Sequence, residues 1–270
     1  MTMAFDEEYF NLGVLDLLSR RDTCIHRLDP RTKVIGTLLF VITVVSFPKY
    51  EIMGLLPFFL FPVLVFSLGD IPVRLILRKV LLVSPFAVLI GIFNPVFDAE
   101  PMGAVGGIAV SGGWVSFVSI MLRFFLTMTA VLLLIATTSF PGICHALRRL
   151  GMPALFTSQL LFLYRYLFVL VEEGMRMVRA RDMRSFGGKG RGMRAFISLV
   201  GTLFLRTMER AERIHQAMLS RGFTGTMRFA GSPRFRAADF ALLAVLTAVL
   251  CAFRAYDIVG TVGRQTERMF

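Results

Sequence analysis

The sequence predicts an all-α, polytopic membrane protein with about five transmembrane helices and a cytoplasmic domain built on two long helices. Hydrophobic residues make up 56% of the 270 residues and the mean hydropathy is +0.69, values typical of a membrane protein. The net charge of +12 comes from residues 140–236, where 17 Lys and Arg stand against 5 Asp and Glu. Because Lys and Arg concentrate in the cytoplasmic parts of membrane proteins, we expect this segment in the cytoplasm.

Residues 1–33 form a polar N-terminal region that we expect in the cytoplasm. An amphipathic helix is predicted around Tyr9–Ser19, and Asp29 and Pro30 are the residue types of a helix N-cap and first helical position. A cleaved signal peptide is not expected, because the N-terminus is acidic and the first apolar run starts only near Val34.

Residues 34–139 contain four apolar runs that we expect to be transmembrane helices. These runs are Val34–Phe47, Ile52–Gly69, Val80–Phe97 and Trp114–Ser139. The segment Asp70–Lys79 carries Arg and Lys and is expected inside, whereas Asp98–Gly113 has neither and is expected outside. Residues 237–270 contain a fifth predicted span, Ala237–Tyr256, and a short tail.

Two further apolar runs are not expected to cross the membrane. Ala154–Val171 and Ala195–Met208 have Arg residues on both sides, so a crossing would place positive charge outside. We interpret them as the first parts of two long helices within residues 140–236, joined by the glycine-rich linker Gly187–Gly192.

The ends of these two helices repeat one pattern, 37 positions apart, in residues 172–188 and 209–225. The matching pairs are Glu172/Glu209, Arg176/Arg213, Ala180/Ala217, Arg184/Arg221, Phe186/Phe223 and Gly188/Gly225. A single Arg before a glycine is ordinary helix capping. Its repetition favours two similar tips that contact two similar acidic surfaces of a partner.

The sequence offers no recognisable catalytic constellation, and we predict neither a cofactor nor a metal site. Three Cys and three His are scattered, and neither Cys-x-x-Cys nor a phosphate-binding P-loop occurs. A nucleic-acid partner is not expected, because the positive-inside rule accounts for the basic charge. Arg123, within the fourth span, is expected to snorkel or to pair with a polar group.

The chain resembles the transmembrane T subunits of energy-coupling-factor (ECF) transporters, in the CbiQ-like cobalt branch. The similarity rests on residues 26–33 (HRLDPRTK), 91–98 (GIFNPVFD), 147–153 (LRRLGMP), 164–167 (YRYL) and the two motifs centred on Arg184 and Arg221. It implies a non-catalytic subunit whose long coupling helices cross in an X. The helix tips would sit in grooves of a CbiO-like ABC ATPase dimer in the cytoplasm.

The resemblance also implies the contact residues and the remaining partners. By motif match, the ATPase-coupling residues are Ala180, Arg181, Arg184, Ser185, Ala217, Arg221 and Gly222. Ser185 departs from the glycine of the family motif. A substrate-binding S subunit, CbiM-like and accompanied by a CbiN-like small subunit, would be held by apolar contact among the lipids of a bacterial or archaeal inner membrane.

The substrate expected from this branch is cobalt. Since the S subunit recognises the substrate, nickel and vitamin importers remain alternatives. A membrane-embedded enzyme acting on an anionic lipid is a third interpretation. The sequence disfavours it, because no acid, base or metal cluster lies near the membrane.

Overall fold

The computed structural model describes residues 16, 18–19, 21–48, 51–97, 101–105, 108–184, 192–227 and 237–255, of which 96–97, 101–111 and 255 by backbone alone. In chain order the elements are α2 (Pro30–Val45), the 3₁₀ helix η1 (Met53–Phe59), α3 (Leu60–Gly69), α4 (Val73–Gly91), α5 (Phe93–Phe97), β1 (Pro101–Val105), β2 (Ile108–Ser111), α6 (Gly112–Thr137), α7 (Phe140–Arg149), α8 (Ala154–Arg184), α9 (Met193–Ser220) and α10 (Ala237–Ala255). The predicted all-α fold is confirmed. The helix predicted around Tyr9–Ser19 falls mostly outside the described residues, and Ser185, linker residues 187–191 and the tail from residue 256 lie wholly outside them.

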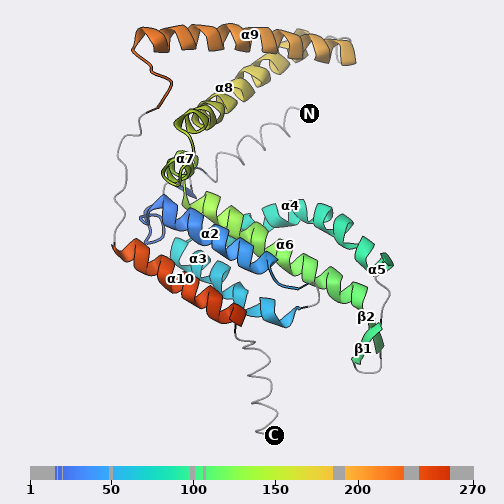
Figure 1. The fold of residues 1–270 in the computed structure, drawn as a ribbon. Coiled ribbons are helices and arrows are strands. Elements are labelled where there is room, and N and C mark those ends of the chain that lie inside the picture. Colours follow the sequence, from blue (N-terminus) through green and yellow to red (C-terminus); the bar gives the residue numbers. More distant parts are fainter. Residues whose placement is uncertain are drawn as a thin grey trace. The chain divides into compact units, whose positions relative to one another are not determined.

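The chain divides into two compact units (Figure 1). The first, called here the bundle unit, contains α2 to α6, the β1–β2 hairpin and α10. The second, called the crossed-helix unit, contains α7, α8, α9 and the residues that follow α9 up to residue 227. It begins at Phe140, where the charge pattern also starts the basic domain. Its cytoplasmic location stays a prediction.

The bundle unit is organised around α6, which packs against α2, α3 and α4, while α10 lies along α2. The buried hydrophobic core consists of Phe40, Val44, Phe47, Leu55, Phe58, Leu126, Ala130 and Leu250. Phe40 also stacks on Phe61 with ring centroids 4.4 Å apart. Gly36 allows α10 to approach α2 closely, since an added Cβ would lie 2.9 Å from Leu246 Cδ2. Aromatic area and close backbone approach therefore hold this unit together.

The outward faces of the bundle unit are apolar as well. On α4, Leu82 leaves 79% of its surface exposed and Phe86 leaves 67%. A soluble helix would place polar residues at such positions, whereas a helix that faces lipid places apolar ones there. The exposed faces are thus suited to hydrocarbon.

Four helices among the described residues are long and apolar enough to cross a membrane. They are Val73–Pro95, Gly112–Thr137, Ala154–Arg184 and Ala237–Arg254. This set includes Ala154–Arg184, which the flanking charges place in the cytoplasm. It leaves out α2 and the short helices η1 and α3 (Met53–Gly69), where the sequence predicted spans. The number and direction of crossings therefore depend on the charge pattern and stay predictions.

Two boundaries differ from the sequence prediction. Helix α4 begins at Val73, seven residues before the expected Val80, because Arg74, Arg78 and Lys79 are good helix formers and extend the helix. The glycine-rich segment before α6 contains an antiparallel hairpin in which Val105 pairs with Ile108. Alternating small and branched residues permit this short pairing, whereas the sequence predicted only that the segment lies outside.

Three helix ends meet at the start of α2, where the predicted cap is confirmed. Asp29 Oδ1 accepts from the Arg31 main-chain N–H at 2.9 Å, and Pro30 occupies the first helical position. The Asp29 main-chain N–H donates to Asp239 Oδ1 on α10 at 3.2 Å. Lys33 Nζ donates to the Thr137 carbonyl at the end of α6 at 2.8 Å. These buried and partly buried bonds tie the ends of α2, α6 and α10 together.

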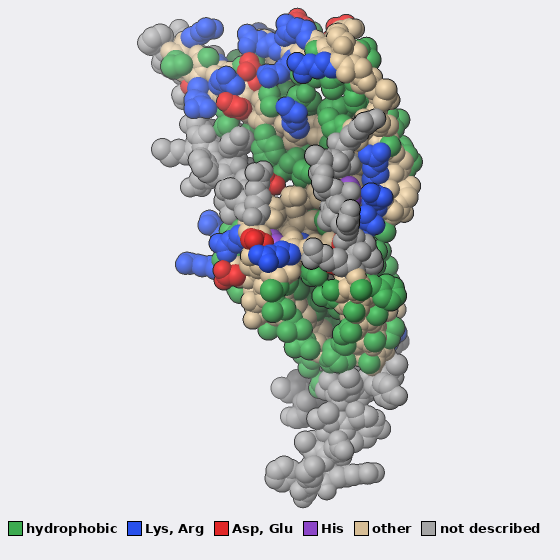
Figure 2. All heavy atoms as spheres, turned by 90° about the vertical axis from the view of Figure 1, so that its left-hand side faces the viewer, with side chains coloured by type: hydrophobic (Ala, Val, Ile, Leu, Met, Phe, Trp, Pro, Cys, Tyr) green, Lys and Arg blue, Asp and Glu red, His purple; other side chains and the backbone are tan. Residues whose placement is uncertain are grey.

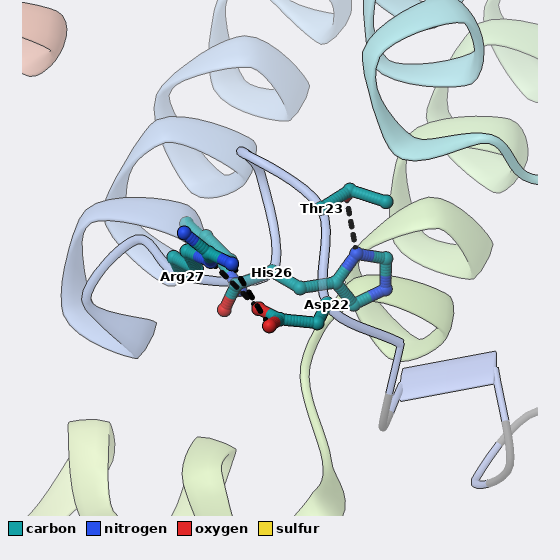
Figure 3. A network of polar contacts seen from close by, with 5 residues as sticks. Asp22, Thr23, His26 and Arg27 are labelled. Carbon is teal, nitrogen blue, oxygen red and sulfur yellow. Dashed lines mark hydrogen bonds and ion pairs between the residues drawn. The ribbon is translucent and has the colours of Figure 1, made fainter.

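The turn that leads into α2 is fixed by local polar pairs (Figure 3). Arg27 donates to both carboxylate oxygens of Asp22, at 2.7 and 2.9 Å, and lowers the pKa of that exposed carboxyl. A 2.7 Å hydrogen bond joins Thr23 Oγ1 and His26 Nδ1, and partial burial lowers the pKa of His26. Neutral His26 is therefore the form that this turn favours.

Candidate functional site

The crossed-helix unit is built on two unusually long helices. Helix α8 has 31 residues and α9 has 28, lengths of about 46 and 42 Å at 1.5 Å per residue. Helix α8 runs obliquely to α9 (Figure 1), and Arg206 Nη1 on α9 donates to Glu173 Oε1 on α8 at 3.2 Å. Beside this pair, an added Cβ on Gly174 would lie 3.7 Å from Leu203 Cδ2. The long crossed helices of the predicted fold are thus present.

The first predicted tip lies at the end of α8. Ala180 and Arg181 are half-buried and Arg184 is exposed. All three line a groove of about 720 Å³ between the second half of α8 and the first half of α9. Arg181 is paired with its neighbour Asp182 at 3.1 Å. The residue after Arg184, the predicted contact Ser185, is not among the described residues.

The second predicted tip lies at the end of α9, and its backbone is fully described. Arg221 is the C-cap, and Gly222 follows with a φ of +78°. The Gly222 N–H donates to the Leu219 carbonyl at 2.9 Å, and the Phe223 N–H donates to the Met218 carbonyl at 3.0 Å. These two bonds define a Schellman motif, in which glycine supplies the left-handed conformation. The glycine at 222 therefore ends the helix and leaves Arg221 exposed.

The structure places the two tips at opposite ends of the crossing. Arg184 lies beside the first half of α9, whereas the end of α9 lies beside the first half of α8 (Figure 1). Neither Arg184 nor Arg221 makes a hydrogen bond or ion pair with another described residue.

Basic side chains gather on this unit. Figure 2 shows Lys and Arg over the unit of α8 and α9, and hydrophobic side chains over much of the visible surface of the bundle unit. Arg176 and Arg206 also line the groove at the first tip, and Glu173 is its acidic residue. The resulting excess of positive charge favours an acidic partner.

The long helices also expose apolar surface. No residue of α9 is buried, and only Thr157 and Ser158 are buried in α8. The large exposed hydrophobic residues of α9 are Met193, Phe196, Ile197, Val200, Phe204, Leu205, Met208 and Leu219. An apolar face of this extent marks a surface that contacts a protein or lipid.

Sequence reasoning missed the contacts that follow the second tip. The segment after α9 returns to the start of α8, where the Met227 main chain meets Ser158 and Arg148. Phe223 packs edge-to-face on Phe162. The repeated pattern included Phe223. Met227 makes its contacts through the main chain, so its residue type gives no signal in the sequence.

One polar feature of the bundle unit bears on an earlier expectation. Arg123 Nη2 donates to the Pro48 carbonyl and, at 3.0 Å, to Ser119 Oγ, so the predicted pairing of this arginine is confirmed. Within the part of the chain that the structure describes, no three His, Cys, Asp or Glu residues gather in a way that could hold a metal ion.

The apolar bundle and the long basic helices define the chain as a helical membrane protein. The family model of CbiQ, "Cobalt transport protein", matches residues 21–230. The chain therefore belongs to the CbiQ family and is a transmembrane component of an ECF-type transporter.

Some of the proteins similar to this chain are named for cobalt transport, and others are named for energy coupling. The cobalt transport protein CbiQ of Salmonella typhimurium is 28% identical over 142 residues, 48% of this chain and 63% of the relative. An EcfT protein of Thermanaerovibrio acidaminovorans is 30% identical over 225 residues, 76% of this chain and 80% of the relative. A putative fused cobalt transport protein CbiMQ of Methanocorpusculum labreanum is 30% identical over 131 residues, 46% of this chain and 22% of that protein.

Proposed function

We propose that this chain is the coupling subunit of an ECF-type importer and passes ATP-driven motion from partner ATPases to a substrate-binding S subunit. The observation that carries the proposal is the pair of exposed arginines, Arg184 and Arg221, at opposite ends of the crossed helices. Two separate tips suit a two-fold partner with one acidic groove per subunit, as an ATPase dimer would offer. The chain itself would hydrolyse no ATP.

The neighbouring residues support this assignment of the tips. Ala180 and Ala217 lie one turn before the two arginines, so no bulky side chain shields either guanidinium on that face. Arg181 and Gly222 complete the described part of the contact, and Ser185 would extend it at the first tip. The apolar face of α9 would hold the S subunit, because contacts of this kind persist while the helices move.

Within this proposal, residues 1–33 and 140–236 are cytoplasmic, and the spans in 34–139 and 237–270 cross an inner membrane. Cobalt is the proposed substrate, because the matching family is a cobalt transport family and one relative is a fused CbiMQ protein. A CbiM-like S subunit, with a CbiN-like small subunit, is accordingly the proposed membrane partner. Nickel is the closest alternative, since both are divalent ions that a separate subunit would select.

The test is co-expression with CbiO-like ATPases and a CbiM-like S subunit, followed by measurement of ATP-dependent Co²⁺ and Ni²⁺ uptake. Changing both Arg184 and Arg221 to Glu reverses the charge at both tips. Loss of one partner of a buried charge pair costs about 2–5 kcal/mol, so the double variant should lose the ATPases and uptake. The proposal is wrong if that variant still co-purifies with the ATPases and imports the ion at the parental rate.

A further inference from the structure

The residues after the second tip are held against the corner between α7 and α8. We call residues 222–227 the return segment. At its end, the Met227 main-chain N–H donates to Ser158 Oγ at 3.1 Å, and Arg148 Nη1 donates to the Met227 carbonyl at 2.7 Å. Both main-chain groups of one residue are thus fixed, by two different helices.

The serine is well suited to this contact. Ser158 is buried, with 4% of its surface exposed, and its hydroxyl donates to the Ala154 carbonyl at 2.9 Å. Since the hydroxyl has one proton and spare lone pairs, it can accept from Met227 while it donates to its own helix. The arginine contact is charge-assisted and short, which makes it the stronger of the two.

Aromatic contacts make the corner itself rigid. Phe140 at the start of α7 stacks on Tyr164 of α8 with centroids 4.4 Å apart and an interplanar angle of 13°. Phe162, two residues before Tyr164 in α8, packs edge-to-face with Phe223 of the return segment, with ring centroids 6.0 Å apart. Helices α7 and α8 and the return segment are therefore packed together as one body.

The return segment is short. Six residues can span at most about 20 Å when fully extended, and the Schellman bonds at Gly222 and Phe223 already fix its first turn. A displacement that takes Arg221 beyond this reach therefore pulls on Met227, and through it on Arg148 and Ser158.

We propose that Arg148 and Ser158 are positioning residues for the second tip: by holding the return segment, they transmit the motion of Arg221 to the α7–α8 corner. This inference rests on the proposed coupling function. It assigns a role to an arginine outside both repeated motifs. When the hold is released, the end of α9 stays linked to α8 only through the pair of Arg206 and Glu173, and the coupling of ATP hydrolysis to import weakens.

The first experiment measures the hold on the purified full-length chain, with no partner present. Hydrogen–deuterium exchange of amides 223–227 is compared among Arg148→Ala, Ser158→Ala and the matched control Arg149→Ala, whose side chain is exposed in the same helical turn. Arg148→Ala and Ser158→Ala should each accelerate exchange about tenfold, which corresponds to ~1.4 kcal/mol. Arg148→Lys keeps a donor and should restore part of the protection. Parental exchange in Arg148→Ala would overturn the inference.

The second experiment measures coupling in the assembled transporter, as Co²⁺ imported per ATP hydrolysed. We expect Arg148→Ala to retain the ATPases and their hydrolysis but to lower this ratio about tenfold, while Arg149→Ala keeps the parental ratio. Arg148→Lys should recover most of the loss, which a general defect of folding would not allow. A parental ratio in Arg148→Ala overturns the positioning role alone. A parental chain that binds no ATPase overturns the proposed function instead.

Discussion

Replacing Gly222 by Ala tests whether the backbone at the second tip sets the position of Arg221. The glycine has a φ of +78°, and an added Cβ would meet no atom within 4 Å. The substitution therefore introduces no steric clash, and its entire effect comes from the left-handed conformation. A side chain with a Cβ pays roughly 1–2 kcal/mol in that region.

This cost falls on the two hydrogen bonds that end α9. Once the Gly222 and Phe223 N–H groups no longer reach the Leu219 and Met218 carbonyls, the last turn frays and Arg221 loses its fixed position. A change of one to two kcal/mol alters an equilibrium by a factor of about 5–30. Amides 221–223 of Gly222→Ala should exchange faster by that factor, and ATP-dependent uptake should fall with it.

Gly201 provides the matched control, because it lies in the middle of α9 and an added Cβ there also meets no atom within 4 Å. Its backbone is helical, so Gly201→Ala should stabilise the helix by roughly 0.5–1 kcal/mol. The two substitutions are chemically identical and are predicted to act in opposite directions. Equal exchange at the end of α9 in both variants would refute the argument that the conformation of Gly222 controls the tip.

Two further predictions concern topology and the bundle unit. A membrane-impermeant maleimide should label Cys24 only in inside-out vesicles. Buried Cys144 should stay unlabelled, because burial raises its pKa to about 11. Roughly one thiol in ten thousand is then a thiolate at pH 7. Labelling of Cys24 in right-side-out vesicles would contradict a cytoplasmic N-terminal region. Asp239→Ala removes the acceptor of the Asp29 N–H and should lower the free energy of unfolding by about 1–3 kcal/mol, measured as a lower thermal midpoint in detergent. Asp239→Asn keeps an oxygen acceptor and should lower the midpoint less. Equal midpoints in the Ala and Asn variants would refute this role of Asp239.

Local sequence signals predicted helix ends better than helix extents. Asp29 and Pro30 predicted the start of α2, and the small residue after Arg221 predicted the end of α9, because capping depends on the residue itself and its nearest neighbours. The start of α4 was misplaced, because Arg74 and Lys79 suit either a loop or a helix. The distribution of charge predicts the side of the membrane but does not predict conformation.

The hold on the return segment could not be predicted, since its partners are 69 and 79 positions apart in the sequence. Its acceptor and donor are main-chain groups, which every residue except proline provides. Only Ser158 and Arg148 carry side-chain chemistry, and buried serines or arginines at helix ends are common for other reasons. A long-range contact to the backbone becomes visible only when the fold brings the segments together.

The repeated pattern also shows that a local sequence does not specify its tertiary contacts. Ala180 and Ala217 match in sequence, yet Ala180 is half-buried in a groove beside α9, whereas Ala217 is exposed. Repetition of a short sequence specifies the local helix and its side-chain spacing, but the neighbouring helix determines what each copy contacts. Because only α8 begins at the rigid corner that receives the return segment, a displacement at Arg221 reaches α8 through Met227 as well as through the crossing at Glu173 and Arg206. The second tip therefore has a direct route to the base of α8, and Arg148 and Ser158 hold it together at Met227.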